Sequence, residues 1–256
     1  MGRVAVEKGV VQPYKTSYWD EVPDWAKDDE GNWMIAYLGT LGWITNTNLV
    51  ENPPESWADM KDGDYRIAVG DVARASQSQS AIIASAYAFG GDLTNLEPGF
   101  EFWRELAKAG RIDKGTCDLS RIEAGEVEVA ILWDYNCLID RDRLKESHPD
   151  VVFQCNVPKD GSVQLGYTTI INKFAPHPYA AALTREYIFS DQGQLNLAEG
   201  YASPIRNVEM PEELKARRIP DEQYANAHPV EDFDAWDKAI AEVSQFWTDE
   251  IVPLLN

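Results

Sequence analysis

The chain has 256 residues, with 23 Lys and Arg against 43 Asp and Glu, which gives a formal net charge of −20. This balance excludes nucleic-acid binders that use Lys and Arg to neutralise phosphates, and it disfavours anionic membrane surfaces. A hydrophobic fraction of 44% is enough to bury a core, so wholesale disorder is excluded as well.

The N-terminal part predicts loops around one extended segment. The first 30 residues predict the end of a helix followed by a surface loop, because prolines and a charged run interrupt them. Residues 32–46 predict a strand pair or one long strand, since aromatic and β-branched residues dominate there. Two prolines then stop the strand, and Ser56 is placed to cap a short helix over 57–60.

The middle of the chain alternates between segments with the periodicity of a strand and segments with the periodicity of a helix. The predicted strands are 65–71, 127–133, 151–157 and 165–171, and the predicted helices are 73–89, 100–109 and 118–124. From residue 178 onward the pattern is helical, with interruptions around 201–206 and at two later prolines. Such alternation predicts an α/β fold in which helices cover a sheet.

The cysteines and the chain start carry little functional signal. Cys117, Cys137 and Cys155 are too few for a disulfide framework and fit no metal-binding spacing, so we expect small buried hydrophobic side chains. No stretch is apolar for long enough to span a membrane. The first residues show no secretory signal, which taken alone indicates the cytoplasm or a missing true N-terminus.

The common catalytic motifs are missing from the sequence. We find no glycine-rich nucleotide loop, no HExxH zinc helix and no GxSxG nucleophile turn. Each of the three histidines precedes a proline, which favours surface loops over a zinc site or a catalytic triad. The sequence therefore predicts no catalytic residue, no metal site and no cofactor.

Polar and aromatic side chains gather where the predicted strands end. The three groups are residues 71–78, 133–136 and 167–169. The first group contains Asp71, Arg74, Ser76, Gln77 and Ser78. Ligands of open α/β sheets bind at such strand ends. A helix N-terminus at 71–78 would attract an anion, whereas a tryptophan face beside a carboxylate suits an amine. The alternatives are a core Trp133, a helix-capping Asp71 and a solvated first turn.

Several motifs carry a family resemblance. Residues 37–46 (YLGTLGWITN), followed by 52–60 (NPPESWADM), resemble a pattern of bacterial extracellular solute-binding proteins. These are the capturing subunits of ABC importers, in the iron, polyamine, thiamine and phosphonate branches with the type II fold. Further matches follow in order at 125–133, 158–161, 172–181, 190–194 and 198–206.

The resemblance implies two α/β lobes, joined by crossover strands, that close on a small solute. Residues 1–52 would form the remainder of lobe 1 and the first crossover strand, 53–163 would form lobe 2, and 164–256 would supply the return strand and C-terminal helices packing on lobe 1. Family members begin with a signal peptide and further strand–helix units that this sequence lacks, so lobe 1 is expected to be incomplete. A periplasmic monomer that docks on ABC permease subunits is also implied.

The resemblance also guides the choice of solute-binding residues and solute. We expect one concave surface between the lobes, formed by Tyr37, Thr40, Asp71, Ser76, Gln77, Trp133, Asp134, Tyr135, Tyr167 and Thr168. Iron-binding branches use adjacent tyrosines after the Ala-Glu-Gly segment, but Ala202 and Ser203 follow Tyr201 here, which disfavours ferric iron.

A small amine, polyamine or aminophosphonate-like zwitterion ranks first among the solutes. The reason is that Asp71 and Asp134 would place two negative charges in a partly desolvated cleft beside Trp133. The alternatives are a purely anionic solute or ferric iron in the same fold, or an acid/base hydrolase or lyase that uses cleft carboxylates.

Overall fold

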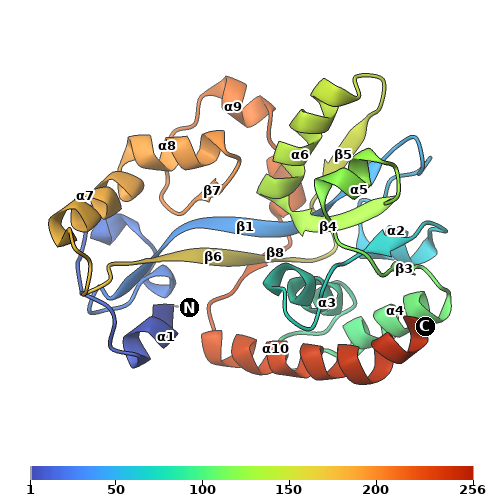
Figure 1. Cartoon of the computed structure of the whole chain (residues 1–256), viewed down its shortest axis with the longest axis horizontal. Coiled ribbons are helices and arrows are strands. Elements are labelled where there is room, and N and C mark those ends of the chain that lie inside the picture. The colour runs from blue at the N-terminus through green and yellow to red at the C-terminus, as the bar shows by residue number, and fades with distance from the viewer. Residues whose placement is uncertain (1, 256) are drawn as a thin grey trace. The chain divides into compact units, whose positions relative to one another are not determined.

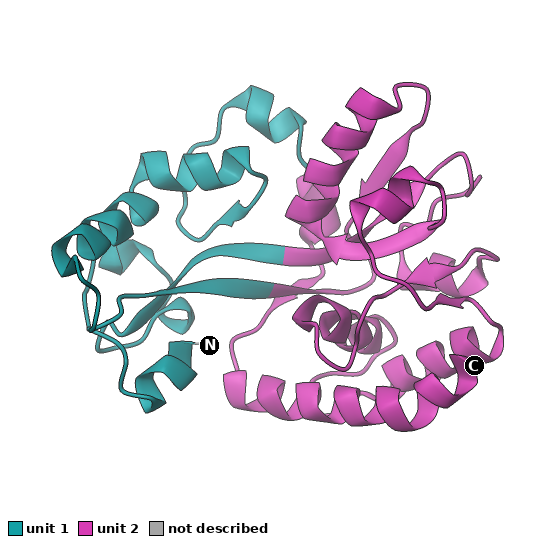
Figure 2. Ribbon diagram, viewed as in Figure 1, with its two compact units in different colours: residues 1–39, 165–218 teal, residues 40–164, 219–256 magenta. Residues whose placement is uncertain are grey.

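The structure is a computed structural model that describes residues 2–255. The chain divides into two compact units (Figure 2). Unit 1 contains residues up to 39 and 165–218, and unit 2 contains residues 40–164 and 219 onward. The strands β1 (Trp33–Asn46) and β6 (Ser162–Ile170), labelled in Figure 1, each contribute residues to both units, as the change of colour along them in Figure 2 shows.

Unit 1 is formed largely by helices around its share of β1 and β6. Its other elements are α1 (Gly2–Glu7), η1 (Trp19–Glu21), η2 (Asp24–Ala26), α7 (Pro178–Phe189), α8 (Asp191–Glu199), β7 (Ser203–Pro204) and α9 (Glu212–Ala216). The two-residue strand β7 pairs antiparallel with β1, so that Pro204 lies opposite Tyr37. The α7 helix leaves the apolar side chains of Tyr179, Leu183 and Tyr187 exposed.

Unit 2 contains most of the sheet and the helices that cover it. Its helical elements are α2 (Trp57–Asp62), α3 (Ser76–Ala88), α4 (Glu97–Lys108), α5 (Leu119–Glu123), α6 (Asp134–Ser147), η3 (Asp221–Tyr224), α10 (Phe233–Phe246), η4 (Trp247–Ile251) and η5 (Val252–Leu255). Its strands, besides its share of β1 and β6, are β2 (Ile67–Ala68), β3 (Ile112–Asp113), β4 (Val129–Trp133), β5 (Phe153–Asn156) and β8 (Ala227–Pro229).

The sheet of unit 2 is mixed, which confirms the predicted α/β class. Strand β2 is parallel to both β3 and β4, whereas β1 is antiparallel to β4 and to β5. Gly42 on β1 is required by this arrangement, because a Cβ there would approach the carbonyl oxygen of Asn156 on β5 to 2.3 Å. At the start of α2, the Ser56 side chain accepts a hydrogen bond from Asp59 N at 2.9 Å, as a capping serine should.

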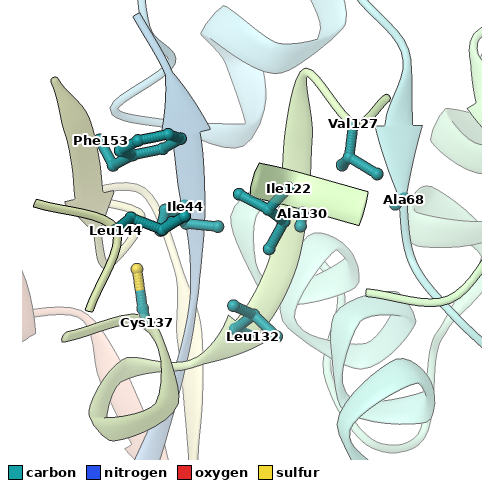
Figure 3. Packing of buried hydrophobic residues seen from close by; sticks show 9 residues of the cluster. All are labelled: Ile44, Ala68, Ile122, Val127, Ala130, Leu132, Cys137, Leu144 and Phe153. Atoms are coloured by element: carbon teal, nitrogen blue, oxygen red, sulfur yellow. The ribbon is translucent and has the colours of Figure 1, made fainter. Parts of the chain in front are cut away.

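One core cluster of unit 2 lies between the sheet and helices α5 and α6, and it includes a disulfide-bonded cysteine. Figure 3 shows nine buried members of the cluster, among them Ile44 of β1, Leu144 of α6 and Phe153 of β5. Cys137 of α6 is bonded to Cys155 of β5. The expectation of three unpaired cysteines is therefore wrong for this pair, because the fold brings together two residues that are 18 positions apart in sequence.

The C-terminal helices do not all pack on the first unit, which differs from what the resemblance implied. The α10 helix packs against α3, and the Phe246 ring stacks on Phe100 of α4 with centroids 4.0 Å apart. The Trp247 ring contacts Trp103 at 5.8 Å. Residues 219 onward therefore belong to unit 2, because their apolar face finds its partners there. Within residues 2–255, no helix is long and apolar enough to cross a membrane.

The remaining cysteine is expected to be chemically inert in the folded protein. Burial raises the pKa of the Cys117 thiol to about 12, and the thiolate is the reactive form of cysteine. At pH 8 the native chain should therefore not react with a thiol reagent such as DTNB, and unfolding in urea should expose one thiol per chain. Rapid reaction of the native protein would contradict this assignment.

Candidate solute-binding site

An aromatic pair on two strands is the most prominent predicted feature of unit 1. Tyr37 of β1 and Tyr167 of β6 stack with ring centroids 4.7 Å apart and planes 9° from parallel. Both side chains are half-buried. Burial is the main cause that raises the pKa of Tyr37, and the neighbouring Tyr167 raises it further. The phenol of Tyr37 is therefore neutral at physiological pH and presents an uncharged aromatic surface.

Thr168 does not join this aromatic pair. Successive side chains of a strand point to opposite faces, so Thr168 faces away from its neighbour Tyr167. The Thr168 methyl group lies against Gly2 of α1, where an added Cβ would approach it to 2.8 Å. The sequence could not show this, because both residues fit the same polar and aromatic pattern.

Asp134 of unit 2 is held by the protein itself. The side chain is fully buried, and its Oδ1 accepts hydrogen bonds from the backbone N–H of Thr40 at 3.0 Å and of Tyr135 at 2.8 Å. Its Oδ2 accepts the hydroxyl of Tyr224 at 3.1 Å. The carboxylate thus ties α6 to β1 and to η3. Because its oxygens already accept these hydrogen bonds, its negative charge is no longer evidence for a cationic ligand.

Trp133 and Gln77 form a second internal group in unit 2. The Gln77 amide accepts from Trp133 N at 3.1 Å and donates to the Ile131 carbonyl at 2.9 Å, which joins the start of α3 to the end of β4. The Trp133 side chain is 4% exposed. Other atoms of the protein therefore cover most of the Trp133 ring.

Three other predicted residues of unit 2 are more accessible, whereas Thr40 is fully buried. Asp71 and Ser76 are exposed, and Tyr135 is half-buried. The Asp71 side chain accepts from Ala73 N at 3.1 Å, as expected of a turn that leads into α3. The predicted residues thus fall into two sets: Tyr37, Tyr167 and Thr168 in unit 1, and the rest in unit 2.

Sequence reasoning missed a tyrosine–arginine contact in unit 1. Tyr201 is the one non-glycine residue with positive φ among residues 2–255, at 65°. Its hydroxyl accepts a hydrogen bond from Arg217 Nη2 at 2.6 Å, and the guanidinium carbon lies 5.2 Å from the ring centroid. The Gly-Tyr step of the family motif was the available signal for Tyr201, but nothing in the sequence pattern marked Arg217 or Tyr224.

A pocket of about 870 Å³ in unit 2 lies apart from all predicted site residues. Its walls come from residues 49–65 and Lys159, and they include the acidic side chains of Glu51, Glu55, Asp59, Asp62 and Asp64. Among the residues that the structure describes, no group of His, Cys, Asp and Glu is arranged to hold a metal ion.

Solved structures with the same fold span most of this chain. The periplasmic binding protein AfuA from Actinobacillus pleuropneumoniae, with fructose-6-phosphate bound, has a TM-score of 0.68 at 20% identity and covers 96% of this chain and 78% of its own. The Atu4243 GABA receptor has a TM-score of 0.68 at 16% identity, with 95% and 76% covered. Apo ferric ion-binding protein A from Pasteurella haemolytica has a TM-score of 0.69 at 17% identity, with 100% and 80% covered.

These similarities confirm the type II periplasmic-binding-protein fold that the resemblance implied. No curated protein sequence matches this chain. A sequence model of the family described as "bacterial extracellular solute-binding protein" matches residues 2–228, which is most of the chain. The chain therefore belongs to the bacterial extracellular solute-binding protein family.

Proposed function

We propose that this chain is the solute-binding subunit of an ABC importer, and that it captures a small amine or zwitterion without converting it chemically. The family match over residues 2–228 is the observation that carries the transport role. ABC permease subunits would receive the solute. The alternative of an acid/base hydrolase loses support because the Asp134 carboxylate is taken up by hydrogen bonds within the protein.

The stacked tyrosines support the solute class. Neutral aromatic faces attract ammonium groups, with contributions of about 0.5–2 kcal/mol. The net charge of −20 also raises the local concentration of cations around the protein. We therefore propose that Tyr37 and Tyr167 contact the ammonium end of the solute.

Ferric iron is a weaker candidate than an organic solute. The hydroxyl of Tyr201 is engaged by the guanidinium of Arg217, and a second cation beside that guanidinium would be repelled. One of the similar structures is a ferric ion-binding protein, but another is a GABA receptor and a third holds fructose-6-phosphate. An organic solute with a charged end fits this chain's side chains better.

The disulfide supports an oxidising compartment. Disulfides persist in the periplasm and outside the cell, whereas cytosolic thiols are kept reduced. The bond between Cys137 and Cys155 therefore supports our proposal that the protein works in the periplasm. It outweighs the cytoplasmic interpretation drawn from the start of the sequence.

A thermal-shift panel tests the solute class. Putrescine, spermidine, 4-aminobutyrate, 2-aminoethylphosphonate, inorganic phosphate and ferric citrate are each added to the full chain. A bound probe at about 100 times its Kd should stabilise the folded protein by roughly 2.7 kcal/mol. We expect at least one ammonium-bearing probe to raise the Tm, and stabilisation by phosphate or iron alone would contradict the proposal.

A variant of the aromatic pair tests its role directly. Replacing Tyr167 by alanine should weaken binding of the ammonium-bearing probe by about 3- to 30-fold, because the cation loses one aromatic face. Tyr179→Ala is the matched control, since Tyr179 lies in the same unit and is 91% exposed. Titration calorimetry gives both Kd values. Equal binding by Tyr167→Ala and Tyr179→Ala would remove Tyr167 from the site.

A further inference from the structure

A buried arginine of unit 1 lacks partners for part of its guanidinium group. Arg185 lies on helix α7 and is 2% exposed. Its Nη1 donates to the Gly31 carbonyl at 3.2 Å, but its Nε and Nη2 are buried and have no hydrogen-bond partner in the described part of the chain. Burial lowers the pKa of Arg185 to about 10, so the group is still charged at neutral pH. A buried charge with unsatisfied donors is unfavourable, so we expect it to have a partner.

The two unpartnered donors lie on one edge of the planar guanidinium. Arg104 of unit 2 uses this edge, because its Nε and Nη2 donate to the two carboxylate oxygens of Glu250 at 2.6 and 3.1 Å. Arg206 of unit 1 uses the same edge for Glu21. The Nε–H and Nη2–H bonds are parallel and match two oxygens of one carboxylate or phosphate. Arg185 therefore presents an edge that other arginines of this chain use for carboxylates.

The neighbouring acidic side chains are engaged elsewhere. Asp28 attracts the Arg185 guanidinium, but its Oδ2 accepts hydrogen bonds from Asn32 N at 3.0 Å and from Asn32 Nδ2 at 2.7 Å. Glu186, the next residue of α7, accepts the hydroxyl of Tyr14 at 2.7 Å and also accepts from Ser17. These bonds hold both carboxylates away from the open edge of Arg185.

The segment 14–31 that contacts α7 carries a second unpartnered polar group. The Gly31 carbonyl oxygen accepts from Arg185 Nη1 at 3.2 Å and from Tyr14 N at 3.0 Å, so these two nitrogens lie no more than about 6 Å apart. Thr16 follows two residues after Tyr14 and is 4% exposed, and its hydroxyl oxygen has no hydrogen-bond partner among the described residues. The segment thus adds a buried hydroxyl donor to the two donors of Arg185.

We propose that Arg185 holds a small oxyanion inside unit 1, through its parallel Nε–H and Nη2–H donors. Formate, acetate and phosphate each offer the two oxygens that this edge needs. Because the guanidinium is covered, the anion is taken up as segment 14–31 closes on α7. Its role is to neutralise a buried charge and so to stabilise the unit. The proposal is independent of the solute class proposed above.

Thermal unfolding of the full chain in sodium formate and in sodium gluconate, at equal ionic strength, tests this proposal. Both anions are monovalent carboxylates, but gluconate is too bulky for a buried edge. At about 100 times its Kd, formate should raise the Tm of the native chain by about 5–10 °C relative to gluconate. Arg185→Met should show no such difference. Arg185→Lys keeps the charge without the planar fork and should show little of it.

Arg218→Met is the matched control, because Arg218 lies in the same unit and already donates to the Ala198 carbonyl at 3.3 Å and to the Ser203 hydroxyl at 3.1 Å. This variant should respond to formate as the native chain does. An equal formate effect on the native and Arg185→Met chains would be a general salt effect and would overturn the proposal. Phosphate that still stabilises Arg185→Met binds elsewhere, so this test and the solute panel can fail separately.

Nuclear magnetic resonance of isotope-labelled formate with the native chain decides the matter if Arg185→Met does not fold. One bound formate per chain, in slow exchange with free formate, would support a covered site. The absence of a bound signal at saturating formate would contradict it.

Discussion

Replacing Trp57 by alanine should lower the free energy of unfolding by about 3–5 kcal/mol, the usual cost of removing a buried tryptophan. Trp57 has no exposed surface, and its indole N–H donates to the Gly161 carbonyl at 2.9 Å. Its ring meets those of Trp43, Phe102 and Trp103 edge-on at 5.2, 5.7 and 6.2 Å. Alanine would leave a cavity among these rings and an unpaired carbonyl.

Urea unfolding followed by far-ultraviolet circular dichroism measures this loss without relying on tryptophan fluorescence. Trp19→Ala is the control, because Trp19 is half-buried in unit 1 and contacts the ammonium groups of Lys15 and Lys27 at 4.8 and 5.1 Å. It should cost about 1 kcal/mol. A loss below about 1 kcal/mol for Trp57→Ala would show that the Trp57 ring is not tightly packed against these aromatic neighbours.

Removing the disulfide should be the next largest change. The double substitution Cys137→Ala and Cys155→Ala should lower the free energy of unfolding by about 3 kcal/mol, because the bond closes a loop of 18 residues in the unfolded chain. Cys137 lies in the core cluster of unit 2 beside Leu144 and Phe153 (Figure 3). Alanine fits this apolar surrounding without adding a polar group.

Cys117→Ala is the control for the disulfide experiment, since Cys117 is not bonded to another cysteine. Dithiothreitol should lower the Tm of the native chain and leave that of the double variant unchanged. A native Tm that is insensitive to dithiothreitol, together with three titratable thiols after unfolding without reductant, would contradict the disulfide.

The sequence predicted those parts of the fold that depend on local patterns. Residues 32–46 are rich in aromatic and β-branched side chains and form the strand β1, and Ser56 caps α2 through its own side chain. Helix α6 was not predicted, because its apolar side chains show little helical periodicity. The position of α10 on unit 2 depends on aromatic contacts such as Phe100–Phe246, which lie far apart in sequence.

The candidate site shows the same limit. Tyr37 and Tyr167 were both predicted, and the structure stacks them, because both lie on segments that were predicted to be strands. Asp134 and Trp133 fit the pattern of a ligand site equally well, but they serve internal bonds and packing. One sequence does not separate a carboxylate that binds a solute from one that accepts Thr40 N–H, since the partner lies 94 residues away.

Arg217 illustrates the opposite case. It follows a short charged helix, α9, and nothing in the sequence of that segment singles out an arginine as functional. Only the fold reveals that its guanidinium lies on the hydroxyl of Tyr201. The role of such a residue depends on a contact that no spacing rule describes.

The central claim is that this chain binds a small solute and does not convert it. Calorimetric titration of the purified chain with the probe that raises its Tm most, followed by nuclear magnetic resonance of the recovered probe, tests that claim most directly. We predict one probe molecule per chain, recovered chemically unchanged after prolonged incubation. Turnover of the probe, or the absence of saturable binding by any of the probes named above, would contradict the account.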